Sequence, residues 1–294
     1  MVLSICKRQV EAMKINIYIA TQKKHDFPKN KNYIPLLVGK PFETLNSGFN
    51  DSVDESISAK NPFYCELTGH YWIWKNDHQS DIVGLCHYRR FLWINDIRQR
   101  LCRKNFVTLN EEIERYLDTC NIESIINDYD IILPRPYAFS KDDIKSQFIF
   151  YHGQENYKLM MSALQNLYPD YFDTAKLVFR RRYEYLANLL ITKKIIFDAY
   201  SEWLFNVLQD VEDHLNLEDK SNARLLGYMG ERLLNLYVVH NKLRIKEVPQ
   251  IFLTGTNDYD EEDLYIDFRY IKRRYFAGIL DIEEKIRKKL KSCQ

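Results

Sequence analysis

The sequence is short of the residues that mark zinc-binding, secreted and membrane-spanning proteins. Its six cysteines, at positions 6, 65, 86, 102, 120 and 293, include no CxxC pair and no His/Cys pattern at the spacing of zinc ligands, so we expect reduced thiols. The first twelve residues lack the apolar centre of a signal peptide. The longest apolar run, Leu186 to Ile191, is far shorter than the roughly 20 residues that span a bilayer. These shortages predict a cytoplasmic protein.

Neither sign of charge dominates, and glycine and proline are scarce. The 294 residues include 42 Lys and Arg against 41 Asp and Glu, and this net charge of +1 gives no basic field for nucleic acid. With 9 Gly, 8 Pro and 46% hydrophobic residues, the chain is globular rather than disordered. The glycine-rich fingerprint of dinucleotide-binding folds is missing, which disfavours a Rossmann dehydrogenase.

The most informative segment is Asp81 to Arg90, where a short apolar strand runs into His87, Arg89 and Arg90. Strands of this kind are buried in α/β proteins, and open α/β sheets bind ligands at the carboxyl ends of their strands. Arginine offers a planar fork of donors that matches phosphate, so the cluster favours an anionic ligand such as a diphosphate. The alternative is an edge strand with its charged side chains in solvent.

An earlier strand is predicted over 14–20, where apolar and polar residues alternate. It leads into a polar loop that begins at Thr21 and contains Lys23, Lys24 and His25. A first strand that delivers such a loop to the carboxyl edge of the sheet is typical of nucleotide-binding folds.

One helix is predicted over 61–76, with Asn61 as its N-cap and Pro62 at its first position. Its polar members Glu66, Thr68 and His70 either face solvent or, for the upper ones, line the cleft beside a ligand. Further helical patterns cover 143–179 and 195–215, and within 224–240 a helix is predicted after Gly230. The first of these carries Tyr151 and His152, which suit contacts to a polar substrate.

A DxD pattern occurs at Asp128 to Asp130, directly before a strand over 130–133. Carboxylates in this pattern hold Mg²⁺ or Mn²⁺ in many nucleotide-sugar enzymes. Here the pattern precedes its strand and therefore lies at the amino edge of the sheet, away from the predicted crevice. We interpret it as a turn entering a strand.

The C-terminal end is basic and amphipathic. Between Lys285 and Lys291 the chain carries five cations, on a segment whose apolar residues recur at helical spacing. Such an end either lies on an anionic membrane surface or docks on the domain as an exposed helix. We therefore divide the chain into an N-terminal extension (1–13), a main domain (14–255) and a basic helical tail (256–294).

Several long strings resemble one bacterial family, long catalogued as a domain of unknown function, whose members are encoded in capsular, exopolysaccharide and O-antigen clusters. The resemblance covers about residues 14 to 255. Its motifs are the strings over 58–76, 84–91, 130–134, 188–193, 200–205 and 227–235. The chain departs from commoner relatives at Leu189 and Leu190, where the family often has Met-Phe, and near Gly69.

The resemblance implies an α/β fold of the GT-A-like nucleotide-diphospho-sugar transferase type. It has a central, mostly parallel sheet flanked by helices and a helical C-terminal elaboration. The implied activity is transfer of a hexose, galactofuranose or galactose, from a UDP-sugar to a lipid-linked glycan in cell-surface polysaccharide synthesis, by a cytoplasmic enzyme peripheral to the membrane.

The resemblance also implies roles for individual residues. Arg89, Arg90 and His87 occupy the place where GT-A folds normally carry DxD, so these side chains would replace the metal ion in neutralising the leaving diphosphate. We expect no required cofactor. Glu231 is the candidate base, in the first turn of its helix, where a carboxylate is also favourable without catalysis. The remaining assignments are Thr21, Lys23, Lys24, His25, Asn61, Glu66 and Tyr88 for the donor, and Asn188, Asn235, Tyr151 and His152 for the acceptor.

Two other hypotheses stay open at the level of sequence. One is a non-catalytic module that binds a nucleotide sugar or glycan, for which the missing DxD would be the natural sign. The other is a metal-dependent transferase that uses Asp128 and Asp130.

Overall fold

The computed structural model describes residues 12–39, 48–94, 102–106, 108–139, 142–253 and 265–266. The predicted extension (1–13) and tail (256–294) lie almost entirely outside these residues, and both stay predictions. The five cations of the tail lie outside them as well.

The central sheet contains the two strands predicted from sequence as neighbours. β1 (Ile15–Thr21) pairs in parallel with β2 (Tyr33–Leu37) and with β4 (Ile82–His87), so β1 and β4 end at the same edge. β2 pairs in parallel with β3 (Phe49–Asn50). On the other side of β4, β10 (Leu190–Lys193) runs antiparallel to β4 and to β7 (Ile131–Pro134), and β11 (Ile245–Val248) is parallel to β7. Within this row β10 alone is reversed, which confirms the mostly parallel sheet.

A second row of strands branches from β4. β5 (Arg90–Leu92) pairs with β4 on one side and with β12 (Gln250–Leu253) on the other. β12 also pairs with β6 (Cys102–Phe106), and β6 pairs with β13 (Tyr265–Ile266). The bridge from His87 to Arg90 makes a tight turn directly after β4. A separate pair, β8 (Tyr137–Ala138) and β9 (Tyr183–Glu184), lies near the end of α9.

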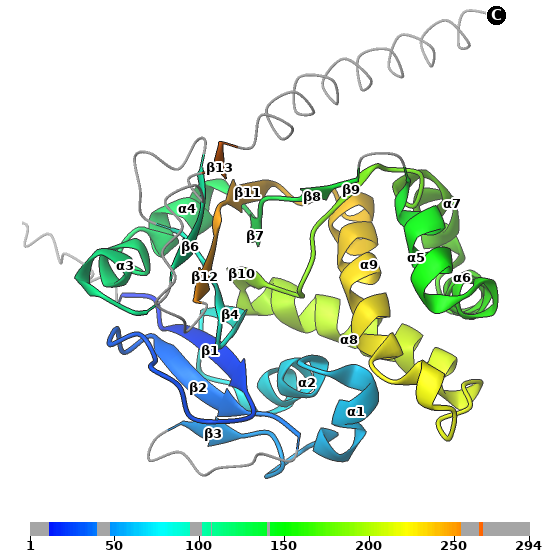
Figure 1. Cartoon of the computed structure of the whole chain (residues 1–294), viewed down its shortest axis with the longest axis horizontal. Coiled ribbons are helices and arrows are strands. Elements are labelled where there is room, and N and C mark those ends of the chain that lie inside the picture. Colours follow the sequence, from blue (N-terminus) through cyan, green and yellow to red (C-terminus); the bar gives the residue numbers. More distant parts are fainter. Residues whose placement is uncertain are drawn as a thin grey trace, which may run out of the picture.

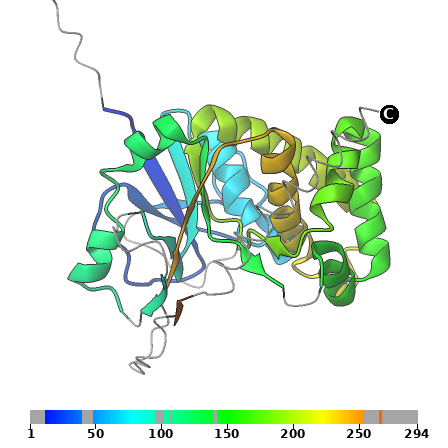
Figure 2. The ribbon, with the colours of Figure 1, turned by 90° about the horizontal axis from the view of Figure 1, so that it is seen from above.

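Helices cover both faces of the sheet (Figure 1). The side chains of β1 alternate between two apolar cores, with Tyr18 and Ala20 in the larger and Ile17 and Ile19 in the smaller, as the two-residue period of a strand requires. The smaller core includes α3 (Glu111–Tyr116) and α4 (Ile122–Asp128). Figure 2 shows α5 (Ile144–His152), α6 (Gln154–Leu167) and α7 (Pro169–Val178) grouped at the opposite end of the molecule.

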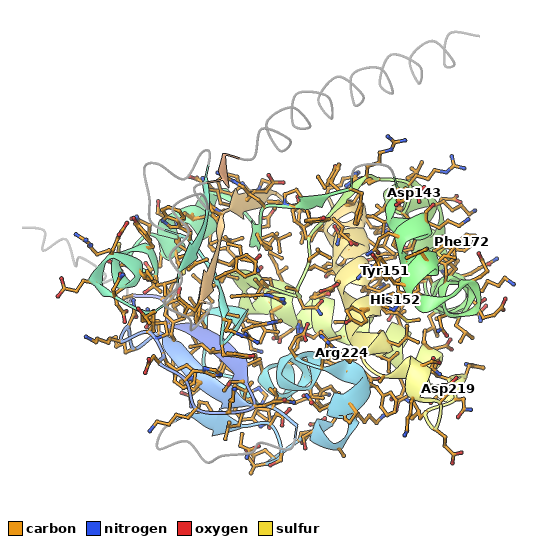
Figure 3. All side chains as sticks on the ribbon, viewed as in Figure 1. Asp143, Tyr151, His152, Phe172, Asp219 and Arg224 are labelled. Atoms are coloured by element: carbon orange, nitrogen blue, oxygen red, sulfur yellow. The ribbon has the colours of Figure 1, made fainter. Side chains whose placement is uncertain are left out.

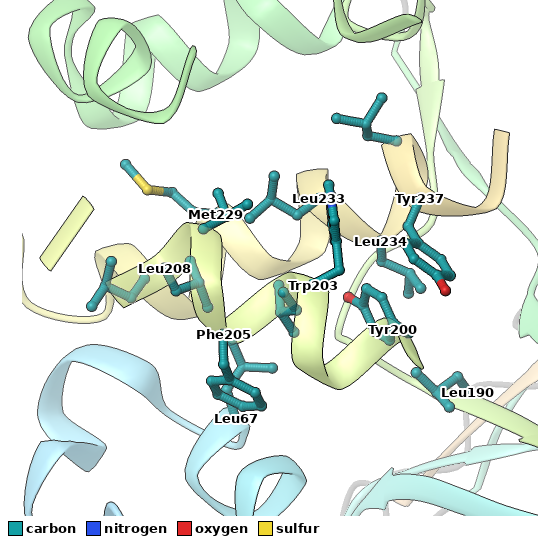
Figure 4. Packing of buried hydrophobic residues seen from close by; sticks show 14 of the residues in the cluster. Leu67, Leu190, Tyr200, Trp203, Phe205, Leu208, Met229, Leu233, Leu234 and Tyr237 are labelled. Carbon is teal, nitrogen blue, oxygen red and sulfur yellow. The ribbon is translucent and has the colours of Figure 1, made fainter. Parts of the chain in front are cut away.

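Two long helices join this group to the sheet. α8 (Lys194–Asp213) confirms the helix predicted over 195–215. α9 (Leu225–His240) confirms a helix that carries Glu231, but it begins before Gly230 and not after it. Their aromatic and aliphatic side chains interlock in the larger core, where Trp203 of α8 lies 5.3 Å from Tyr237 of α9 between ring centroids (Figure 4). This packing fixes the position of α9 relative to the sheet.

The helix predicted over 61–76 is interrupted. It forms α1 (Asn61–Tyr64) and α2 (Leu67–Asn76), and Cys65 between them has φ of 53°. Lys60 rather than Asn61 holds the N-cap position, so the predicted cap is wrong. The Asn61 amide instead donates to the Cys65 carbonyl at 2.7 Å, which is one of the acceptors that the break releases.

Candidate functional site

Two adjoining cavities lie at the carboxyl ends of β1 and β4, the edge predicted for a ligand. The larger has a volume of about 960 Å³ and the smaller about 410 Å³. Both are lined by Cys65, Glu66, His87 and Arg224, which form the wall between them. We call these four residues the shared wall. The break between α1 and α2 supplies half of it, because it turns Cys65 and Glu66 toward both cavities.

The smaller cavity is bounded by the loop after β1 and the start of α1. Thr21, Asn61 and Tyr88, three of the residues assigned to the donor, line it. The buried Thr21 hydroxyl donates to the Lys23 carbonyl at 2.6 Å and so holds the loop in place. His25 stacks on Tyr88 with ring centroids 4.1 Å apart. Lys23 and Lys24 are exposed and are not among the residues that line either cavity.

His87 lies at the end of β4 with its ring largely buried. Burial, assisted by the nearby positive charges of Arg90 and Arg224, lowers its pKa to about 3. Its Nε2 atom is 3.8 Å from a carboxylate oxygen of Glu66. His87 is therefore a neutral imidazole at physiological pH and contributes no positive charge to the predicted cationic cluster.

The two arginines after β4 point in different directions. Arg90 lines the larger cavity, where its guanidinium lies 5.9 Å from the Phe252 ring centroid. Arg89 does not line either cavity. Its guanidinium lies over the Tyr88 ring at 4.8 Å and donates to the Tyr88 hydroxyl at 2.5 Å. The predicted pair of cations is thus reduced to one at the cavity surface.

The second cation comes from a residue that the sequence did not single out. Arg224 lines both cavities from the position before α9, with φ of 65°. Its backbone N–H donates to the Pro62 carbonyl at 2.8 Å, and its side chain hydrogen-bonds Cys65. Its place directly before a strongly apolar helix is the only signal in the sequence. Residue type does not predict its backbone, since a left-handed conformation is rare for arginine.

Glu66 is the carboxylate of the shared wall. It accepts a hydrogen bond from the Asn188 side chain at 2.7 Å, and burial raises its pKa, while Asn188, Arg224 and Arg90 act in the opposite direction. Of the polar residues predicted to face solvent or the cleft, Glu66 lines both cavities. Thr68 and His70 do neither, because both are fully buried, and His70 packs against Phe197 and is bonded to Ser201.

Glu231 lines the larger cavity from α9. One carboxylate oxygen accepts from the Ala187 backbone N–H and the other from Arg232, both at 2.7 Å. Burial raises its pKa and the charge of Arg232 lowers it. Because α9 begins at Leu225, Glu231 lies in the second turn and not in the first turn as predicted. The helix N-terminus does not explain a carboxylate there.

A second buried carboxylate stands behind Glu231. Arg232 is only 2% exposed and lies 3.3 Å from Glu184, whose carboxylate is fully buried. Burial raises the pKa of Glu184 to about 7, opposed by Arg232 and assisted by Glu231. Arg232 also donates to Gln147 of α5 at 2.6 Å. One guanidinium thus ties α5 and β9 to the cavity carboxylate.

The four predicted acceptor residues divide into two pairs. Tyr151 and His152, at the end of α5, line the larger cavity across from Arg224 (Figure 3). His152 stacks on Tyr228 with ring centroids 4.6 Å apart, and burial lowers its pKa to about 4. Asn188 and Asn235 are buried and line neither cavity.

Those two amides hold the cavity wall from behind. Asn188 also donates to the Gly227 carbonyl at 3.2 Å, and Asn235 both donates to and accepts from the backbone of Tyr185 at 2.9 Å. Ala187 and Asn188 have positive φ values, 71° and 48°. Gly227 permits the close approach of the break between α1 and α2 to α9, since a Cβ there would lie 3.2 Å from the Cys65 side chain.

Asp130 lies at the amino edge of the sheet, opposite the cavities, as predicted. It precedes β7, which runs parallel to β4, and its carboxylate pairs with Arg244 at 2.9 Å. Among the described residues no group of three or more His, Cys, Asp or Glu side chains could hold a metal ion. At the end of β4, in place of a DxD pattern, the chain has the His87 imidazole and the Arg90 guanidinium, and the Glu66 carboxylate lies beside His87.

No helix in the described part of the chain is long and apolar enough to cross a membrane. In that part Cys65, Cys86 and Cys120 are free thiols, in line with the expectation of reduced cysteines.

Comparison with known proteins agrees with this architecture. Among solved structures the chain is similar to the apo structure of the bifunctional glycosyltransferase WbbM, with 29% sequence identity and a TM-score of 0.76. The match covers 84% of this chain and 48% of the WbbM chain, so this chain spans about half the length of that protein. No curated protein sequence matches it. The likeness confirms the predicted GT-A-like fold.

The model of one family matches residues 16–242, which is most of the chain and includes every residue that lines the two cavities except Gln250 and Phe252. This chain therefore belongs to the family described as Domain of unknown function (DUF4422).

Proposed function

We propose that this chain is a glycosyltransferase that moves a hexose, galactofuranose or galactose, from a UDP-sugar to a lipid-linked oligosaccharide of a cell-surface polysaccharide. The observation that carries the proposal is the pair of adjoining cavities that share one wall. A transferase needs a place for the nucleotide, a place for the acceptor, and reacting groups between them. The similarity to a bifunctional glycosyltransferase supports the same activity.

The smaller cavity suits the nucleoside end of the donor. Asn61 and Gln22 offer side-chain amides to hydrogen-bond the base or the ribose, and Tyr88, held by His25 and Arg89, forms an aromatic part of the wall. The diphosphate would then lie along the shared wall, within reach of Arg224 and Arg90. The sugar would extend into the larger cavity, where the acceptor enters.

The cations at the wall supply the electrostatic part of catalysis. When the bond between the anomeric carbon and the diphosphate oxygen breaks, negative charge develops on the departing UDP. Arg90 and Arg224 are fixed positive groups beside that position, and preorganised charges of this kind stabilise the transition state more than the ground state. We assign the role of a divalent cation to them, so the transfer requires no metal.

In an inverting transfer the acceptor hydroxyl must also lose a proton. Glu231 is our candidate base, because it lines the larger cavity and Arg232 favours its ionised form. Both of its oxygens accept one hydrogen bond, which leaves lone pairs for the acceptor hydroxyl. The bond to the acceptor oxygen forms as its proton passes to Glu231.

Binding and hydrolysis of UDP-galactofuranose, UDP-galactose and UDP-glucose, each with and without EDTA, test the proposal. We expect UDP to bind, one donor to be hydrolysed or transferred, and EDTA to have no effect. Replacing Arg224 by Ala should weaken UDP binding about 30-fold, the loss of one charge-assisted hydrogen bond. Failure of all three donors and of UDP to bind would reject the function.

Two other outcomes separate the alternatives. Donor binding without hydrolysis or transfer to any acceptor would support a non-catalytic binding module. Loss of activity in EDTA would support a metal-dependent enzyme. Association with the inner membrane surface through the basic tail is a further part of the proposal, and it depends on the sequence of residues 285–291.

A further inference from the structure

Exposed aromatic side chains gather at the mouth of the larger cavity. Among the described residues four large aromatic side chains are exposed, and three of them line this cavity: Tyr137 (49%), Phe150 (81%) and Tyr151 (65%). We call these three the aromatic rim. Water-exposed aromatic faces cost free energy unless a ligand covers them, so their concentration at one opening calls for an explanation.

The rim connects to the interior through a series of ring contacts. Phe150 and Tyr151 lie 5.0 Å apart between centroids with their planes perpendicular, and Tyr151 is 6.4 Å from His152. His152 in turn stacks on Tyr228, which lines the cavity three residues before Glu231. The aromatic surface therefore runs from solvent to the neighbourhood of the proposed base.

We propose that the aromatic rim is an acceptor subsite that binds the sugars behind the terminal one, so that the protein selects an oligosaccharide over a monosaccharide. This inference rests on the proposed function. A sugar ring presents an apolar face of C–H groups, which packs on an aromatic ring, and a polar edge of hydroxyls, which needs hydrogen-bonding side chains. Gln147 and Asp142 line the cavity beside the rim and supply those partners.

The lining favours a saccharide over the lipid part of the acceptor. A polyprenyl chain would be matched by aliphatic side chains, yet Leu186 and Ala187 are the only such side chains among the described residues that line this cavity. The volume also leaves room for more than one sugar. About 960 Å³ is near the top of the ~300–1,000 Å³ range of small-molecule sites, and the nucleoside has its own cavity.

The rim is suited to truncation experiments because its members are exposed. We would make Phe150→Ala, Tyr137→Ala and the double variant. Phe172→Ala is the matched control, since Phe172 is a partly exposed aromatic residue of α7 that lines neither cavity (Figure 3). Circular dichroism and the dissociation constant of UDP report folding and an intact smaller cavity.

The probes are an array of bacterial surface oligosaccharides of two to six sugars, the terminal monosaccharide of the best binder, and vesicles that contain a polyprenyl phosphate. We expect the best oligosaccharide to bind the wild-type protein at least tenfold more tightly than its terminal monosaccharide. Each single rim variant should lose about fivefold in oligosaccharide affinity and the double variant about 20-fold. The rim variants should bind the monosaccharide with the affinity of the wild type. Phe172→Ala should bind the oligosaccharide as the wild type does.

Equal affinity of the wild type for the oligosaccharide and the monosaccharide would overturn the inference, and so would rim variants that bind the oligosaccharide as the wild type does. A third contrary result is binding to the polyprenyl phosphate vesicles, but to no oligosaccharide, that the rim substitutions weaken. If UDP still binds, such a result rejects the subsite and leaves the proposed function standing. If neither UDP nor any donor binds to the wild type, the proposed function itself has failed.

Discussion

The two cavities meet at one wall but differ in the chemistry that their linings offer. Apart from the shared wall, the described lining of the smaller cavity has no charged side chain. The larger cavity adds Glu231, Arg232 and Arg90, together with the aromatic rim. On the proposed function, the nucleotide is recognised on one side of Glu66 and Arg224 and transfer is catalysed on the other. Substitutions on the two sides should therefore have separable effects.

The largest expected effect comes from the larger cavity. Glu231→Gln keeps the size of the side chain but removes its ability to take a proton, so turnover should fall by about 10²- to 10⁴-fold. The dissociation constant of UDP should stay within about twofold. Transfer rates and calorimetry measure the two quantities, and Glu155→Gln on the surface of α6 is the control. A parallel loss of UDP binding would show that the two cavities do not act separately.

The neighbouring arginines give the next largest contrast. Arg90→Ala removes a cation from the cavity and should reduce turnover by about 10²- to 10³-fold, as the loss of one preorganised donor does. Arg89→Ala removes only an exposed contact with Tyr88 and should cost about threefold. Steady-state kinetics of both variants with one donor measure the difference. Equal losses of turnover in the two variants would contradict the conclusion that Arg90, and not Arg89, lies at the cavity.

A smaller effect is expected on stability, from the carboxylate behind Glu231. The pKa of Glu184 is raised to about 7 in the folded chain, so its protonated form stabilises the fold below pH 4.5 and this contribution is lost as the pH rises to about 7. Glu184→Gln should remove that decline. The difference in unfolding free energy, variant minus wild type, should therefore increase by about 2 kcal/mol from pH 5 to pH 8.

Urea unfolding at both pH values measures this gain. Asp51, whose pKa burial raises to about 6, contributes a decline of the same sign in both proteins and cancels from the difference. Identical pH profiles for Glu184→Gln and the wild type would mean that Glu184 is ionised throughout this pH range. Arg232 would then pair with two ionised carboxylates, those of Glu184 and Glu231.

The smallest effect is expected from the cap of α5. The Asp143 side chain accepts from the Ser146 backbone N–H at 2.7 Å, and Asp143→Ala should cost about 1 kcal/mol of stability. Because α5 carries Tyr151 and His152, hydrogen exchange should accelerate over 144–152 and acceptor affinity should fall. Asp219 makes a similar cap on Ser221 away from both cavities, and Asp219→Ala should leave α5 unchanged. Faster exchange over 144–152 in both variants would contradict this link.

The sequence predicted most reliably those elements whose residues alone carry a local pattern of apolar and polar side chains. The alternating pattern over 14–20 and the apolar run before His87 predicted β1 and β4, and parallel pairing places the ends of both strands at one edge. Helix α8 was predicted from its periodicity. Burial on both sides of a strand or along one face of a helix leaves a pattern in the residues themselves.

The parts that sequence reasoning missed depend on contacts between distant segments. The break at Cys65 and the position of Arg224 both involve left-handed backbone at non-glycine residues, which residue type does not reveal. Proximity to Arg90 in sequence suggested a cavity position for Arg89, but the Tyr88 ring next to it offered a better local partner. Asn188 and Asn235 were read as sugar contacts, whereas their hydrogen bonds show amides that brace the backbone and Glu66.

The brace on Glu66 has a consequence for how the molecule is made. Asn188 comes 122 positions after Glu66. A nascent chain that has emerged from the ribosome only as far as residue 180 already contains β1, β4 and Arg90 but not the amide that orients the central carboxylate. The shared wall thus matures late in synthesis, after most of the lining of the smaller cavity has been translated.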